Sequence, residues 1–147
     1  MDDPFPLTSA QLVRYIDAAG ENDHIDAKRP VTWDGAAESA ALAKDIAAFA
    51  NSRDGGVLVI GKSEITPGQF ELTGLTEKEA GSFDQTKIST WINKRFEPPI
   101  RFTCHRVEHH GKIFAVITVV EFADVPHLCV KTVCRDPQQI DCCAGVA

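Results

Sequence analysis

Long apolar stretches are missing from this sequence. No run approaches the roughly 18 residues of a membrane-spanning helix, so we expect no membrane segment. The N-terminal segment, MDDPFP, is acidic and lacks the basic and apolar regions of a signal peptide. These two absences together predict a cytoplasmic protein.

Paired cysteine motifs and a surplus of positive charge are missing as well. The five cysteines contain no C-x-x-C pair, and their odd number favours reduced thiols over a disulfide framework. The net charge is −6, which argues against a protein that coats DNA through a broad basic face. A small basic cleft, or an enzyme whose carboxylates hold cations, remains compatible with this charge.

The composition that is present is that of a globular protein. With 147 residues, 44% of them hydrophobic, the chain is long enough to bury a core, and we expect one domain over residues 1–147. Periodicity and turn signals predict helices at about 8–19, 37–50 and 83–95, and strands at 25–29, 57–60, 69–72, 100–107, 112–121 and 127–133. We expect strand 69–72 to pair with strand 57–60. The mixture predicts an α+β fold with a mixed, mainly antiparallel sheet packed by two or three helices.

Residues 55–63, GGVLVIGKS, satisfy the phosphate-loop pattern G-x-x-x-x-G-K-[ST] from Gly56 onward. A phosphate loop follows a strand and opens a helix, so that backbone N–H groups hold the phosphates. Here the four variable positions are Val, Leu, Val and Ile, which favour a buried strand. Pro67-Gly68 follows closely and leaves no room for a helix. The pattern therefore predicts a central strand, with no P-loop NTPase activity and no bound ATP.

Acidic and basic side chains gather near the predicted strand 25–29. Asp26 and Lys28 are two residues apart, so on a strand they project from the same face. If this strand neighbours strand 57–60, Glu21 and Glu64 could join Asp26 at one end of the sheet. Carboxylates suit hard cations such as Mg²⁺ or Mn²⁺, which assist phosphodiester hydrolysis. The alternative is an Asp26–Lys28 surface ion pair worth under about 1 kcal/mol.

A longer pattern carries a resemblance to a known family. The sequence has Glu21-x₄-Asp26-x-Lys28, then DIAAFAN over residues 45–51, then GGVLVIG over residues 55–61. This resembles the AlbA-like domain of the Schlafen family, which shows E-x₄-E-F-K, a helix ending in AFAN, and a Gly-Gly unit entering an apolar strand that ends in glycine. The resemblance runs from about residue 21 to residue 121.

The resemblance implies a function and a set of residues. Family members include endoribonucleases that cut transfer and ribosomal RNA with three carboxylates and a divalent metal, and others are DNA-binding proteins or regulators. Carried over by position, the catalytic residues are Glu21, Asp26, Lys28 and Glu64, and the metal ligands are the three acids. The family pattern has Glu where this sequence has Asp26, and Asp where it has Glu64. Each change moves a carboxylate oxygen by over an ångström, which is enough to damage a catalytic geometry that needs close placement.

This sequence also departs from the family pattern. Animal members carry a zinc site built from a His-x-Cys pair and a Cys-Cys pair. Neither pair stands at the matching place here, so we expect no zinc, and we interpret the histidines near residues 105–110 as partly exposed side chains at a hairpin end. The residues to inspect for a metal are Cys104, His105, His109 and His110. Relatives continue into one more C-terminal strand, which we expect this chain to lack.

Contacts to nucleic acid require cations. The candidates near the proposed site are Arg29, Lys44, Arg53 and Lys62. A second group consists of Lys94, Arg95, Arg101 and Arg106, and each of these residues could equally be an ordinary solvated cation. Trp91 fits the inner stripe of a helix and favours a core position, whereas Trp33 in a loop could stack on a base.

Three functions therefore stand as hypotheses. The first is a metal-dependent endoribonuclease acting on structured RNA such as tRNA, with Mg²⁺ or Mn²⁺ as cofactor. The second is a non-catalytic DNA- or RNA-binding or regulatory module, and the third is a dimerising scaffold. Because the family's nuclease core has two similar lobes, the resemblance implies a homodimer.

Overall fold

The computed structural model describes residues 8–20, 24–121 and 128–129. The elements in chain order are α1 (Ser9–Ala18), β1 (Ile25–Lys28), α2 (Ala37–Ala50), β2 (Gly56–Ile60), β3 (Lys62–Thr66), β4 (Gln69–Leu72), α3 (Glu77–Ser82), α4 (Gln85–Asn93), β5 (Phe96–Glu97), β6 (Phe102–His109), β7 (Lys112–Val119) and β8 (Leu128–Cys129). Within these residues, no helix is long and apolar enough to cross a bilayer.

The main sheet has four strands in the order β1-β2-β7-β6. The edge strand β1 runs parallel to β2, and the β2–β7 and β6–β7 pairs are antiparallel. Two smaller ribbons, β3–β4 and β5–β8, complete the strands. The predicted α+β class, with a mixed and mainly antiparallel sheet, is confirmed.

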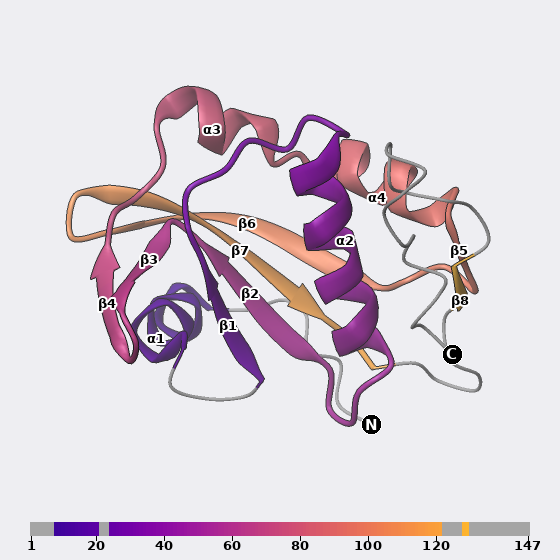
Figure 1. The fold of residues 1–147 in the computed structure, drawn as a ribbon, viewed down its shortest axis with the longest axis horizontal. Coiled ribbons are helices and arrows are strands. Elements are labelled where there is room, and N and C mark those ends of the chain that lie inside the picture. The colour runs from indigo at the N-terminus through magenta and orange to yellow at the C-terminus, as the bar shows by residue number, and fades with distance from the viewer. Residues whose placement is uncertain (1–7, 21–23, 122–127, 130–147) are drawn as a thin grey trace.

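The two long helices cover opposite faces of this sheet (Figure 1). Side chains alternate along β2, so that Leu58 and Ile60 pack with α2 while Val57 and Val59 pack with α1. A strand buried on both faces reads as a continuous apolar run, which is what the sequence shows here. The α2 side also contains Trp33, which is 3% exposed and meets Trp91 edge to face at 5.4 Å between ring centroids. Trp33 is therefore a core residue, and the expectation that it could stack on a base was wrong.

The phosphate-loop pattern lies in a strand followed by another strand. Its four apolar residues form β2, which is buried throughout, and Lys62 and Ser63 begin β3. Gly61 separates the two strands with a φ of 120°, and its N–H donates to the Lys28 carbonyl at 2.8 Å. The prediction of a central strand is confirmed, and the strand–loop–helix order that holds a nucleotide is not present at this segment.

The expected pairing of strand 69–72 was wrong. Strand β4 pairs with β3, which lies in a segment that we expected to be a loop, and not with β2. The expected helix at 83–95 is present as α4, which Asp84 starts by accepting a hydrogen bond from the Lys87 N–H at 2.8 Å, and α3 is a separate short helix before it. Helices α1 and α2 begin and end within one residue of the predicted bounds.

Candidate functional site: a lysine between two carboxylates

Asp26 and Lys28 lie on the edge strand β1 and face the side of the sheet that α2 covers. Their neighbours Ile25 and Ala27 pack on the α1 side, so the alternation of the strand turns Asp26 and Lys28 the other way. The Lys28 Nζ lies 3.0 Å from Asp26 Oδ2. The predicted pairing on one strand face is therefore present.

A second carboxylate reaches the same ammonium from α2. Asp45 Oδ2 lies 2.8 Å from Lys28 Nζ, which places one cation between two acids from different elements. All three side chains are partly exposed, at 31% for Lys28, 43% for Asp26 and 36% for Asp45. We call these three residues the Lys28 cluster.

The pKa of Lys28 is raised above its ordinary value of 10.5. Burial alone disfavours the charged ammonium, but the hydrogen bonds to Asp45 and Asp26, together with their negative charges, outweigh that penalty. Lys28 therefore stays charged at neutral pH and offers a fixed positive charge at the edge of the sheet.

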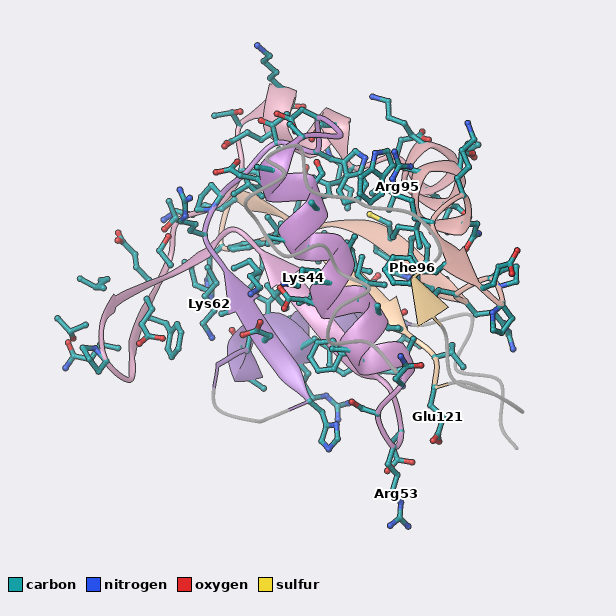
Figure 2. The ribbon with its side chains drawn as sticks, turned by 45° about the vertical axis from the view of Figure 1, so that its right-hand side comes forward. Lys44, Arg53, Lys62, Arg95, Phe96 and Glu121 are labelled. Carbon is teal, nitrogen blue, oxygen red and sulfur yellow. The ribbon has the colours of Figure 1, made fainter. Side chains whose placement is uncertain are left out.

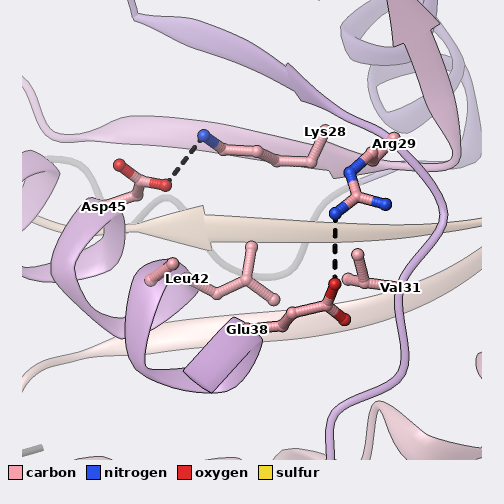
Figure 3. A pocket seen from close by; sticks show the side chains of 7 residues that line it. Lys28, Arg29, Val31, Glu38, Leu42 and Asp45 are labelled. Carbon is pink, nitrogen blue, oxygen red and sulfur yellow. Dashed lines mark hydrogen bonds and ion pairs between the residues drawn. The ribbon is translucent and has the colours of Figure 1, made fainter. Parts of the chain in front are cut away.

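A cavity of about 140 Å³ opens beside the Lys28 cluster. Its lining residues are Lys28, Arg29, Val31, Glu38, Ala41, Leu42 and Asp45. Figure 3 shows Lys28 reaching Asp45 on one side and Arg29 reaching Glu38 on the other, with Leu42 between the two pairs and Val31 beside the Arg29–Glu38 pair. The Arg29–Glu38 contact of 3.1 Å joins two well-exposed side chains, so it constrains Arg29 weakly.

The other two predicted acids have different outcomes. Glu21 lies outside the described residues. Glu64 is exposed on β3, opposite Phe70 in the ribbon, and its carboxylate makes no hydrogen bond or ion pair with any described residue. The structure thus joins Asp26 with Lys28, while a meeting of Glu21, Asp26 and Glu64 at one metal stays a prediction.

The four predicted nucleic-acid-binding cations differ in their exposure to solvent. Lys44 and Arg53 are exposed, on α2 and in the turn after it, and Figure 2 shows Arg53 projecting away from the molecule. Lys62 is 6% exposed, and its Nζ donates to the backbone carbonyls of Ile16 and Asp17 at 2.9 Å each. Because Lys62 caps the C-terminal end of α1, we exclude it from the proposed nucleic-acid surface.

Sequence reasoning did not assign Asp45 a chemical role. Its position was recognised only as part of the DIAAFAN string. One signal could have found it: Asp45 lies three residues after Leu42 and next to Ile46, both buried, so it flanks the helix stripe that faces the sheet. A carboxylate at such a border needs a partner, and the charged residues of the neighbouring edge strand are the natural choice.

The acidic residues fit a hard divalent cation in their chemistry. Mg²⁺ and Mn²⁺ prefer oxygen ligands, and a carboxylate has about four lone-pair sites, so Asp26 keeps acceptor capacity after binding Lys28. Glu64 offers a carboxylate without an internal partner among the described residues. The pairing with Lys28 holds Asp26 and Asp45 in place and partly neutralises their charge.

The cysteine and histidine inspected for a zinc site on β6 are otherwise engaged. Burial raises the pKa of Cys104 to about 12, so its thiol is protonated at neutral pH and is a poor metal ligand. The His105 Nε2 lies 2.8 Å from the Thr103 hydroxyl, and burial lowers the pKa of His105. Among the described residues, Cys104 and His105 do not belong to any group of three potential metal ligands.

Comparison with known proteins gives a family and a shared fold. A family model described as Schlafen, AlbA_2 matches residues 21–138. The chain is similar to the solved N-terminal domain of a protein from Nitrosomonas europaea related to the ATP-dependent DNA helicase RecG, with a TM-score of 0.58 and 22% identity over 86% of this chain and 83% of that one. It is also similar to the DIP2311 protein from Corynebacterium diphtheriae, with a TM-score of 0.51 and 19% identity over 80% of this chain but 23% of the other. No protein with a curated description matches the chain in sequence.

Proposed function

This chain belongs to the Schlafen AlbA_2 family, and from that membership we propose that it is a nucleic-acid-processing domain. More specifically, we propose a metal-dependent endoribonuclease that cleaves structured RNA such as tRNA. The observation that carries this proposal is the Lys28 cluster, in which one charged ammonium lies between two carboxylates beside an open cavity. A phosphodiester-cleaving site needs both charges, because acids hold the metal while a cation balances the phosphate.

Each residue of the cluster has a proposed role. Asp26 would hold Mg²⁺ or Mn²⁺ together with Glu21 and Glu64, which is the carboxylate set that the family pattern implies. Such a metal ion, when bound, would lower the pKa of a water molecule and neutralise phosphoryl charge. The Lys28 ammonium stabilises the negative charge that develops on the phosphoryl oxygens. Asp45 orients Lys28 from the helix side, which makes Asp45 a positioning residue.

RNA contacts are proposed for Arg29, Lys44 and Arg53. All three are exposed and lie on or next to α2 and β1, on the side of the sheet that carries the Lys28 cluster. A small basic region of this kind can bind phosphates locally although the whole chain is acidic. A single lobe with a cavity of about 140 Å³ is too small to enclose a folded RNA, so we propose that two copies form a homodimer.

A second function is favoured by one of the comparisons. The Nitrosomonas europaea structure is an N-terminal domain of a protein related to a DNA helicase, a context in which a domain of this fold can bind nucleic acid without cutting it. In that role the Lys28 cluster would hold β1 to α2 rather than act on phosphate. A third possibility is a dimerising scaffold that binds neither DNA nor RNA.

One assay separates these three functions. Purified protein is incubated with end-labelled tRNA and Mn²⁺, with EDTA as a blank, and products are resolved on a gel. The nuclease proposal predicts discrete fragments that disappear with EDTA and with Asp26→Ala. Glu71→Ala, which removes an exposed carboxylate from β4, is the matched control and should cleave normally.

The remaining outcomes select the alternatives. Binding of tRNA or duplex DNA without cleavage would support the binding module. Absence of binding even at low salt, where phosphate contacts are strongest, would leave the scaffold. Light scattering in the same buffer tests the dimer, which should have twice the 16.0 kDa mass of the chain.

A further inference from the structure

Three potential metal ligands meet on the other face of the sheet, where α1 ends and the β6–β7 hairpin turns. They are Asp17 of α1, His109 at the end of β6 and His110 in the turn, and one ligand atom from each lies within 4.8 Å of the others. His109 Nε2 is 2.9 Å from Asp17 Oδ1, and the two imidazole centroids are 4.0 Å apart. In the part of the chain that the structure describes, no other such group is found.

The local fold brings these side chains together from positions 92 residues apart. The hairpin closes with a two-residue turn, since His109 pairs with Lys112 across the strands. Both turn residues have positive φ, 52° for His110 and 72° for Gly111, as tight hairpin turns of this type require. A histidine is therefore held in the left-handed region, and its ring lies against that of His109.

The C-terminal end of α1 is held in place by a buried lysine. The carbonyls of Ile16 and Asp17 accept hydrogen bonds from Lys62 Nζ, which fixes the end of α1 relative to β3. The Asp17 carboxylate itself points to the histidines, and its side chain is 57% exposed.

We propose that Asp17, His109 and His110 form a binding site for a divalent transition-metal ion such as Zn²⁺. Two imidazole nitrogens and one carboxylate oxygen are a donor set typical of zinc, with a fourth position left for water. Ligand atoms around tetrahedral zinc are about 3.4 Å apart, given bonds of about 2.1 Å, so small rotamer shifts bring this group into place. His109 is suited to anchor the site, because its side chain is only 14% exposed.

The site is independent of the proposed nuclease centre. Asp17 belongs to the α1 side of the sheet, whereas Asp26, Lys28 and Asp45 belong to the α2 side. It also differs from the zinc pattern of animal Schlafen proteins, since no cysteine takes part. Its effect would be to clip the C-terminal turn of α1 to the β6–β7 hairpin, so zinc binding should stabilise the folded chain.

The experiment uses the full chain stripped of metal with EDTA and then dialysed. Zn²⁺ is titrated by calorimetry, and Tm is measured with Zn²⁺ and separately with Mg²⁺. We expect one Zn²⁺ ion per chain and a Tm rise of about 5 °C or more at about a hundred-fold excess over Kd. Any change in Tm with Mg²⁺, which prefers oxygen ligands and which the proposed nuclease centre would bind, should be the same in wild type and in variants of the Asp17–His109–His110 group.

Two variants test the assignment without removing a fold determinant. His110→Asn deletes one imidazole while keeping a residue that tolerates positive φ, and Asp17→Asn removes the carboxylate charge. Each should raise the Kd for Zn²⁺ by at least about ten-fold. The control is His105→Gln, which removes a histidine of β6 outside the group and should bind Zn²⁺ with the wild-type Kd.

Several results would overturn the proposal. A wild-type chain without saturable Zn²⁺ binding would show that Asp17 and His109 form an ion pair and nothing more. Equal Kd values in wild type and both variants would place the zinc elsewhere. A Co²⁺-substituted chain with an intense thiolate charge-transfer band would assign the metal to cysteines, whereas the proposed nitrogen and oxygen ligands give weak bands alone.

Discussion

Lys28 lies between two acids that come from different elements, Asp26 on its own strand and Asp45 on α2. Removing the ammonium would leave two carboxylates close together without their shared cation, and like charges at such a distance disfavour each other. The cluster is therefore both a structural link between β1 and α2 and a candidate chemical centre. These two roles can be separated because stability and activity are measured independently.

The charge of Lys28 predicts a specific pH dependence of stability. Because the folded-state pKa lies above 10.5, the stabilisation by this ammonium is fully present below that pH and is lost as pH rises through the folded pKa. We expect Lys28→Met to lower the free energy of unfolding by about 1 kcal/mol at pH 7, given the partial exposure of the group. Urea unfolding of both proteins from pH 7 to pH 11 measures the difference.

That difference should stay constant from pH 7 to about pH 9.5 and shrink above about pH 10.5. Taking the difference between wild type and variant cancels the titration of the other lysines. A gap that closes at or below pH 9 would mean that the Lys28 pKa is lowered by burial rather than raised by its two partners.

The sequence predicted part of this site and not the rest. Asp26 and Lys28 could be paired because residues two apart on a strand share a face. Asp45 could not be paired with Lys28, since the position of α2 over β1 depends on tertiary packing that the sequence pattern does not specify. Lys62 was misread for a related reason: its ammonium is buried against α1 carbonyls, and nothing in its local sequence marks that contact.

At the scale of elements, α2 packs closely on β2. A Cβ added to Gly56 would lie 2.1 Å from Phe49 Cδ1, so the ring of Phe49 packs directly on the strand backbone. This contact explains why a glycine starts β2. It also keeps α2, and hence Asp45, at a fixed height above the edge strand.

We expect Gly56→Ala to lower the free energy of unfolding by about 2 kcal/mol or more, because either α2 or the Phe49 ring must move. Gly81→Ala is the matched control. Gly81 lies in α3 with no atom within 4 Å of an added Cβ, so this change should be neutral or stabilise by up to about 1 kcal/mol. Equal denaturation midpoints for Gly56→Ala and wild type would contradict the close packing.

Elements with strong local signals were predicted well. A Thr8 cap and apolar periodicity located α1, and the alanine-rich stripe located α2. β3 was missed because four of its five residues, KSEIT, are polar and most are exposed, so the strand carries no alternating apolar pattern. Its pairing with β4 depends on the turn at Pro67-Gly68 and on backbone hydrogen bonds, which residue types report only weakly.

At the scale of the molecule, a net charge of −6 must be reconciled with RNA binding. The proposal places the productive cations on and next to α2, so their removal should matter more than removal of cations elsewhere. We expect Lys44→Ala/Arg53→Ala to weaken tRNA binding and to reduce the salt slope of log K by about 2, close to one unit per phosphate contact. Fluorescence anisotropy measured at salt concentrations from about 50 to 200 mM gives that slope.

A charge-matched double variant on the other helices serves as the control. Lys78 on α3 and Lys87 on α4 are both exposed, and Lys78→Ala/Lys87→Ala should leave the salt slope within about 0.5 of wild type. If both double variants lose affinity equally, binding depends on overall charge and the α2 side has no special role.

In the proposed nuclease, the Lys28 ammonium acts on the phosphate that is cleaved. The most direct test is the single-turnover rate of tRNA cleavage in Mn²⁺ by wild type, Lys28→Met and the surface control Lys78→Met, with tRNA affinity measured in parallel. We expect Lys28→Met to lower the rate by about 100-fold or more, the typical cost of removing one charge-stabilising donor, while the chain stays folded and binds tRNA. A Lys28→Met rate equal to that of wild type would show that this ammonium has no part in cleavage.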